Sequence, residues 1–166
     1  MLNVKQVIEE GLLKLDESKG APAQVGFDLS LKAVQQIAGK GVAMGKVLKD
    51  KSQLTTYTPM QTTMLDGVEG WILYAGVYDF TFNEGCNIPA NRTGFIKQRS
   101  SLYRNGTIIN SAVFDPGFAT DNMGTVAYVF ETLFIEKDAR VAQMYFHENA
   151  DAEKYNGQWQ GDKQRG

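Results

Sequence analysis

The chain has 166 residues, of which 43% are hydrophobic and 22% are charged, and its formal net charge is −2 at pH 7. This length suits one domain whose core is large enough to be stable without disulfides or a structural metal. The slightly acidic balance argues against a broad nucleic-acid-binding face, and no apolar run approaches the roughly 18 residues that cross a bilayer. We therefore expect neither nucleic-acid nor membrane partners. The single cysteine, Cys86, cannot form an intrachain disulfide, so we expect a cytoplasmic protein.

The N-terminal segment NVKQVIEEGLLKL predicts one amphipathic helix, because apolar residues from Val4 to Leu13 recur on a single helical face. From Val25 apolar and polar residues alternate, which predicts a strand over 25–31 with Asp28 on its polar face. Further short strands are expected at 33–38, 41–48, 54–58, 71–75, 77–82, 94–98, 107–114, 125–130, 132–136 and 140–146. The pattern predicts a mainly β fold with one N-terminal helix, either a β-sandwich or a jelly-roll-like barrel, and of these we expect the jelly-roll-like distorted β-barrel.

Residues 1–150 carry this pattern and are expected to form a single β domain. Residues 151–166 are polar and lack either periodicity, yet they include the large aromatics Tyr155 and Trp159. A loose terminus and a segment that becomes ordered when it closes over a ligand both fit this composition. We therefore expect a flexible C-terminal lid segment.

The stretch QRSSLYRNG lies in a basic part of an acidic protein, since no carboxylate occurs between Glu84 and Asp115. Four positive residues occupy this span: Arg92, Lys97, Arg99 and Arg104. Such a local charge suits a small polyanion better than a nucleic-acid duplex, although a solvated basic loop is the alternative. Arg99, Ser100 and Ser101 follow a predicted strand, where hydroxyls, backbone N–H groups and a guanidinium can converge on phosphate oxygens.

The stretch FDPGF places Asp115 at a second junction between a strand and a turn, with the flat apolar side chain of Phe118 beside it. A carboxylate next to a phosphate-binding turn can orient and deprotonate water. The intervening segment NGTIINSAVF, which contains Asn110, can form a hairpin that presents backbone donors and acceptors to a base. A single histidine, His147, argues against a histidine-rich metal site, and we expect it on the surface after a strand.

Taken in order, five segments resemble the motifs of the trimeric dUTPase and dCTP deaminase superfamily. They are VGFDLSL (25–31), QRSSLYRNG (98–106), AVFDPGF (112–118), ARVAQMYF (139–146) and DAEKYNGQWQ (151–160). The leading helix, the approach NIPANRTGFIKQRSSL and the tail look closer to the deaminase-like branch than to ordinary dUTPases. The resemblance implies a homotrimer with active sites at subunit interfaces, binding a deoxynucleoside triphosphate with Mg²⁺ on its phosphates.

The resemblance also implies roles for single residues. Ser100, with its neighbour Ser101, matches the phosphate-contacting serine motif, and Arg99 and Arg104 match the arginines that organise that site. Asp115 matches the aspartate that holds the deoxyribose hydroxyl and activates water. The other matches are Asn110 (base-reading segment), Phe118 (under the sugar), Gln143 (fourth motif), Asp28 (first motif, mainly structural, or simply a surface-strand aspartate), and Lys154, Tyr155 and Gln158 (tail, closing over the triphosphate).

Two chemistries remain after these assignments. The deaminase branch uses a glutamate about ten residues after the motif aspartate, where this chain has Thr125, and the first carboxylate on that strand is Glu131. Hydrolysis requires only that Asp115 orient water, because the metal-bound triphosphate supplies charge stabilisation. The leading hypothesis is a dUTP diphosphatase that releases dUMP and pyrophosphate. The alternatives are a dCTP deaminase that uses Glu131, alone or coupled to hydrolysis, and a catalytically silent dNTP-binding trimer.

Overall fold

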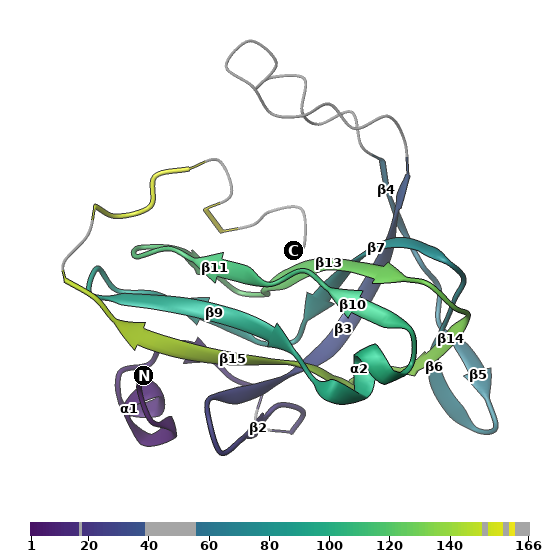
Figure 1. Ribbon diagram of the computed structural model, residues 1–166, viewed down its shortest axis with the longest axis horizontal. Helices are drawn as coiled ribbons and strands as arrows, with labels where there is room; N and C mark the ends of the chain where they lie inside the picture. The colour runs from purple at the N-terminus through teal and green to yellow at the C-terminus, as the bar shows by residue number, and fades with distance from the viewer. Residues whose placement is uncertain (17, 39–55, 151–152, 158–159, 162–166) are drawn as a thin grey trace, which may run out of the picture.

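The computed structural model describes residues 1–16, 18–38, 56–150, 153–157 and 160–161. Figure 1 shows a curled antiparallel sheet with a short helix, α1 (Val4–Glu9), near the N-terminus and a second, α2 (Ser100–Arg104), beside one end of the sheet. Neither of these helices is long and apolar enough to span a membrane. The predicted mainly β, barrel-like fold is confirmed in the described residues.

The main sheet has nine strands, seven of them in the order β10-β13-β7-β3-β15-β9-β11, while β2 and β4 also pair with β3. Its strands are β10 (Thr107–Ile109), β13 (Gly124–Val129), β7 (Gly76–Phe82), β3 (Phe27–Ala38), β15 (Arg140–Glu148), β9 (Arg92–Gln98), β11 (Ala112–Phe114), β2 (Ala21–Pro22) and β4 (Thr56–Pro59). The edge strands β10 and β11 are joined by Asn110 and Ser111 alone. Because strands lie about 4.8 Å apart, a two-residue link cannot span a flat row of seven, so the sheet curls until its edges approach.

Two smaller sheets complete the described fold. One has the order β1-β8-β12 and the other β14-β6-β5. Their strands are β1 (Leu13–Lys14), β8 (Gly85–Asn87), β12 (Ala119–Thr120), β14 (Leu133–Glu136), β6 (Val68–Leu73) and β5 (Thr63–Leu65). In Figure 1 the second sheet lies at the right-hand end of the molecule.

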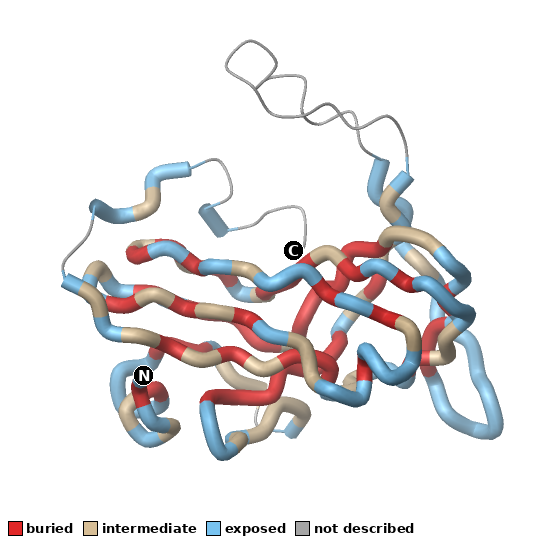
Figure 2. Tube along the Cα trace, viewed as in Figure 1, coloured by how far each residue is buried: buried red, intermediate tan, exposed pale blue. Residues whose placement is uncertain are grey.

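The core fills the inside of the curl, where Figure 2 shows buried residues along the central strands. Among the largest fully buried side chains are Phe27, Leu29, Leu31, Phe80, Phe82, Met123 and Phe146. Each contributes roughly 1.5–3 kcal/mol through the removal of apolar surface from water. The predicted alternation along β3 is only half right, because its polar residues Asp28 and Ser30 are buried as well, at 7% and 0% exposure. Other parts of the chain cover that second face.

The first helix is shorter than predicted. Asn3 and Gln6 form a capping box at its N-terminus, and the helix ends at Glu9, shortly before Gly11 adopts a left-handed φ of 62°. Leu12 and Leu13 then enter the core outside the helix, and Leu13 belongs to β1.

The prediction of one strand over 107–114, with a hairpin in this segment, is also wrong. The segment is split into β10, which pairs with β13, and β11, which pairs with β9, so these strands do not form a hairpin with each other. The structure shows a crossover at Asn110 and Ser111 between the two edges of the curled sheet. The strands predicted at 25–31 and 33–38 form one strand, β3, and the strand predicted at 41–48 lies outside the described residues.

One buried carboxyl supports β3 from its outer side. Glu84 has no exposed surface, and it accepts hydrogen bonds from the backbone N–H of Ser30 at 2.9 Å and from the Ser30 hydroxyl at 2.7 Å. The side-chain amide of Asn83 donates in turn to the Ser30 hydroxyl oxygen at 3.0 Å. Burial raises the pKa of Glu84, and the hydrogen bonds from Ser30 offset this only in part.

The raised pKa predicts how stability depends on pH. The folded state binds the Glu84 proton more tightly than the unfolded state, so this stabilisation is present below pH 4.5, the ordinary value, and is lost as the pH rises through the folded-state pKa. We expect Glu84→Gln to remove that loss. The unfolding free energy of the variant, relative to that of wild type, should therefore increase as the pH rises. Urea unfolding at several pH values between 4 and 8 measures this difference.

Asp121→Asn is the matched control, because the ammonium of Lys14 lowers the pKa of Asp121. Its stabilisation is therefore present above the ordinary pKa and is lost as the pH falls. Because that loss falls mainly below the ordinary value of 3.8, the control should differ from wild type by a nearly constant amount over most of the measured pH range. A difference between Glu84→Gln and wild type that stays constant with pH would contradict the prediction.

Candidate functional site

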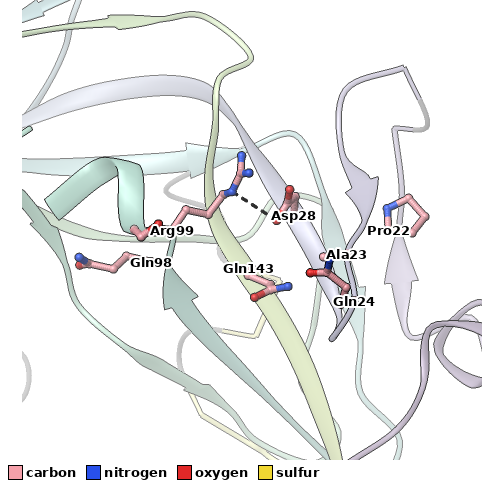
Figure 3. A pocket seen from close by; sticks show the side chains of 8 residues that line it. Pro22, Ala23, Gln24, Asp28, Gln98, Arg99 and Gln143 are labelled. Atoms are coloured by element: carbon pink, nitrogen blue, oxygen red, sulfur yellow. Dashed lines mark ion pairs between the residues drawn. The ribbon is translucent and has the colours of Figure 1, made fainter. Parts of the chain in front are cut away.

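A cavity of about 680 Å³ opens on the outer face of β3, β15 and β9. It is lined by Pro22, Ala23, Gln24, Asp28, Gln98, Arg99, Ser100 and Gln143. Figure 3 shows these side chains coming from segments that are distant in the sequence. The cavity therefore brings together the predicted residues Arg99, Ser100 and Gln143, together with Asp28.

The cavity wall is organised by Asp28, whose carboxylate lies between two guanidinium groups. Arg99 Nε lies 3.6 Å from Asp28 Oδ1 (dashed in Figure 3), and Arg140 Nη1 lies 3.8 Å from Asp28 Oδ2. Arg99 also donates a hydrogen bond from Nη1 to the backbone oxygen of Arg140 at 3.2 Å. One carboxylate beside two arginines leaves a local positive charge, which favours an anionic ligand.

Asp28 is therefore more than a surface-strand aspartate, since its side chain is only 10% exposed and lines the cavity. Sequence reasoning missed Arg140, which pairs with this carboxylate, and Gln24, which lines the same cavity. Arg140 could have been found, because it lies in the motif segment ARVAQMYF. No sequence feature near Gln24 indicated that this residue lines the cavity.

Of the three remaining candidate residues in the stretch QRSSLYRNG, only Ser100 lines the cavity. Helix α2 begins at Ser100, and this residue lines the cavity. Ser101 lines a separate, smaller groove beside β14. Arg104 lies in the last turn of α2, with its guanidinium carbon 5.9 Å from the ring centre of Tyr103, and does not line the cavity.

Asp115 opens a tight turn that is well supported by backbone hydrogen bonds. The N–H of Phe118 donates to the Asp115 oxygen at 3.1 Å, and the N–H of Gly117 donates to Ile88 at 2.7 Å. Gly117 has a left-handed φ of 84°, and a β-carbon there would lie 2.8 Å from Lys154. The Asp115 side of the turn is exposed, whereas Phe118 is 8% exposed and packs 5.7 Å from the Phe114 ring.

The described part of the tail packs onto this turn of its own chain. The N–H of Tyr155 donates to the backbone oxygen of Pro116 at 2.6 Å, and its ring meets Phe118 edge-on at 5.5 Å. The side-chain amide of Gln160 donates to Gly117 O at 2.9 Å and accepts from Ala119 N at 3.3 Å. Lys154 adjoins Gly117, and Gln158 lies outside the described residues.

The cavity and Asp115 lie at opposite ends of β9. Phe114, just before Asp115, pairs with Gly94, whereas Arg99 follows the far end of the same strand. At about 3.3 Å per residue, this places Asp115 roughly 15–20 Å from Arg99 within one chain. Figure 1 shows the corresponding separation between α2 and the end of β11. One copy of the chain therefore does not bring the predicted phosphate site and the predicted water-activating carboxylate together.

The segment around Asn110 lies nearer the cavity. The Asn110 N–H donates to Val126 O at 2.8 Å, and its backbone oxygen accepts a 2.7 Å bond from the hydroxyl of Thr125. Thr125 occupies the depth at which a deaminase glutamate was expected. Glu131 instead lies past the end of β13, exposed beside Gly106 at the opposite end of β10.

His147 lies within β15, not after it as expected. It meets the rings of Phe95 and Tyr145 edge-on at 5.5 and 5.7 Å. Its neighbour Glu148 lies 3.5 Å from Arg92. Among the residues described, no group of three or more His, Cys, Asp or Glu side chains is arranged to hold a metal ion.

Comparison with known proteins gives relatives over most of the chain. A Methanosarcina barkeri protein named probable deoxyuridine 5'-triphosphate nucleotidohydrolase is 37% identical over 142 residues, which cover 82% of this chain and 79% of that protein. The deoxyuridine 5'-triphosphate nucleotidohydrolase of Methanocaldococcus jannaschii is 35% identical over 142 residues, which cover 83% of this chain and 86% of that protein.

Among solved structures, the 2'-deoxycytidine 5'-triphosphate deaminase from Agrobacterium tumefaciens has a similar fold, with a TM-score of 0.61 and 16% identity. The match covers 88% of this chain and 46% of that one. The sequence profile described as dCTP deaminase-like matches residues 2–149, which include the cavity and the Asp115 turn. The chain therefore belongs to the dCTP deaminase-like family.

Proposed function

We propose that this protein hydrolyses dUTP to dUMP and pyrophosphate. The observation that carries the proposal is the cavity at Arg99, Ser100 and Gln143, which presents positive charge, a hydroxyl and an amide to an anion. The relatives named deoxyuridine 5'-triphosphate nucleotidohydrolases share 35–37% of the aligned residues with this chain, which supports the same substrate.

In this mechanism the cavity binds the phosphates and Asp115 orients a water molecule toward the α-phosphorus. The water oxygen forms a bond to that phosphorus as the bond to the bridging oxygen breaks, and pyrophosphate leaves. The Asp115 carboxylate accepts the proton of the attacking water and releases it to solvent. Phe118, fixed by Phe114 and Tyr155, offers an apolar surface for the sugar.

Mg²⁺ fits this site as a partner of the triphosphate. The ion would be held mainly through the phosphates themselves, because Asp28, the only carboxylate among the cavity-lining residues, is already paired with Arg99 and Arg140. When bound, the ion would neutralise charge on the phosphates. Arg99 and Ser100 would still position the phosphates, because they line the same cavity.

The separation of Asp115 from the cavity leads us to propose a homotrimer whose active sites are shared between copies. In a cyclic assembly each interface joins two different surfaces, so one copy can supply the phosphate cavity and the next can supply Asp115. Exposed apolar side chains support association: Val113, Ile108, Tyr128 and Phe130 are 43–59% exposed in the single chain. We also propose that residues 151–166 act as a lid segment, with Tyr155 beside the sugar and Lys154 and Gln158 toward the phosphates.

Hydrolysis is favoured over deamination because of Thr125. Its hydroxyl donates a hydrogen bond to the backbone oxygen of Asn110, and the glutamate considered in its place, Glu131, lies beyond the far end of β13. A cytoplasmic location is part of the proposal. It is supported by Cys86, the single cysteine, which is buried and unpaired and whose pKa burial raises to about 12.

Asp115→Asn tests the catalytic assignment. Because the amide cannot accept the proton of water, we expect kcat for dUTP to fall about 10²–10⁴-fold. Nucleotide affinity should change only a few-fold, since the phosphate cavity is intact. Pyrophosphate release and calorimetric binding of a non-hydrolysable dUTP analogue measure the two quantities. Wild-type protein that binds dUTP without releasing pyrophosphate would support the silent trimer instead.

Mixing two inactive variants tests the shared active site. Arg99→Gln removes the cavity charge in one copy and Asp115→Asn removes the carboxylate in another, so co-refolded mixtures regain intact sites between copies. Random assembly should restore roughly a quarter of the wild-type activity at equal amounts. Asp115→Asn mixed with Asp115→Ala is the control and should stay inactive. If the first mixture also stays inactive although it forms trimers by sedimentation, each site is built within a single copy.

A further inference from the structure

A single side chain closes the seam between the two edges of the curled sheet. Gln98, the last residue of β9, accepts a hydrogen bond at Oε1 from the backbone N–H of Ile109 on β10 at 3.0 Å. These two strands are not neighbours in the sheet order, because β10 pairs with β13 and β9 pairs with β15 and β11. The Gln98 amide thus takes the place of a backbone ladder between them.

Further hydrogen bonds fix the segment that follows Ile109. The Thr125 hydroxyl donates to Asn110 O, the Asn110 N–H donates to Val126 O, and Lys97 Nζ donates to the Ser111 hydroxyl at 3.2 Å. Ile109 is 4% exposed and anchors the segment in the core, whereas Asn110 is exposed. The crossover residues Asn110 and Ser111 are both exposed, so this part of the segment is presented outward.

Gln98 also lines the phosphate cavity beside Arg99 and Ser100. Figure 3 shows it at the α2 side of the cavity, next to the start of that helix. One side chain therefore connects the phosphate-binding turn to the segment that would read the base. Two backbone segments that are joined by such a hydrogen bond keep a constant separation when either one binds part of a ligand.

We infer that Gln98 is a positioning residue that sets the base preference of this site by holding the backbone of Ile109–Ser111 in register with the phosphate-binding turn. The inference rests on the proposed hydrolysis of dUTP. Uracil and cytosine differ at only two positions of their hydrogen-bonding edge, so a small shift of a backbone donor or acceptor exchanges the preferred base. Loss of the Gln98 acceptor frees the Ile109 N–H and permits that shift.

Two substitutions of similar size separate the functions of this side chain. Gln98→Met removes the acceptor for Ile109 without adding charge, so we expect the ratio of kcat/KM for dUTP over dCTP to fall at least ten-fold. Inhibition by pyrophosphate should stay within two-fold of wild type. Gln98→Glu keeps an acceptor but adds negative charge at the cavity, so the base ratio should be retained while pyrophosphate inhibition weakens several-fold.

Thr125→Val provides an independent variant on the other side of the segment. It removes the hydroxyl that holds Asn110 O and should also lower the base ratio, with pyrophosphate inhibition unchanged. A general loss of stability would instead lower the melting temperature and reduce kcat/KM for dUTP and for dCTP by the same factor. An unchanged dUTP/dCTP ratio in Gln98→Met and Thr125→Val would overturn the inference. A wild-type protein that does not hydrolyse dUTP would overturn the proposed function, and the two failures are thus distinct.

Discussion

The separation that β9 imposes between its two ends controls the rest of this site. The strand begins beside the Asp115 turn and ends at Arg99 and Ser100, so its length sets the distance between a carboxylate and an anion cavity. An extended strand cannot shorten, because its rise of about 3.3 Å per residue follows from backbone geometry. Chemistry that needs both groups therefore requires a second copy, and the assembly becomes part of the proposed active site.

The curl of the sheet is the second constraint, and it links base reading to phosphate binding. Because Asn110 and Ser111 alone join the two edge strands, the crossover must lie where those edges approach. Gln98 bonds to Ile109 just before this crossover, Thr125 bonds to Asn110 within it, and Gln98 also lines the cavity. The geometry that closes the barrel is thus the geometry that would hold the base-reading backbone.

Burial explains where sequence reasoning succeeded and where it failed. The alternation along β3 correctly predicted that Phe27, Leu29 and Leu31 face the core. It could not show that Asp28 and Ser30 are covered on the other face, because their partners Arg140 and Glu84 lie more than fifty residues away. Likewise, the residues of segment 107–114 favour strands in either arrangement, and only the pairing with β13 and β9 decided against a hairpin.

From the sequence alone we predicted the mainly β class, the positions of most long strands, and Arg99, Ser100 and Gln143 as anion-binding residues, and these three line one cavity. These follow from local periodicity, from charge along the chain and from the resemblance of short motifs. The three-dimensional structure was needed to show that Asp28 lines the cavity and pairs with Arg140, that Thr125 and not Glu131 contacts Asn110, and that Asp115 lies a strand's length away. The reason is that strand pairing joins distant segments, and its register is set by packing of the whole sheet.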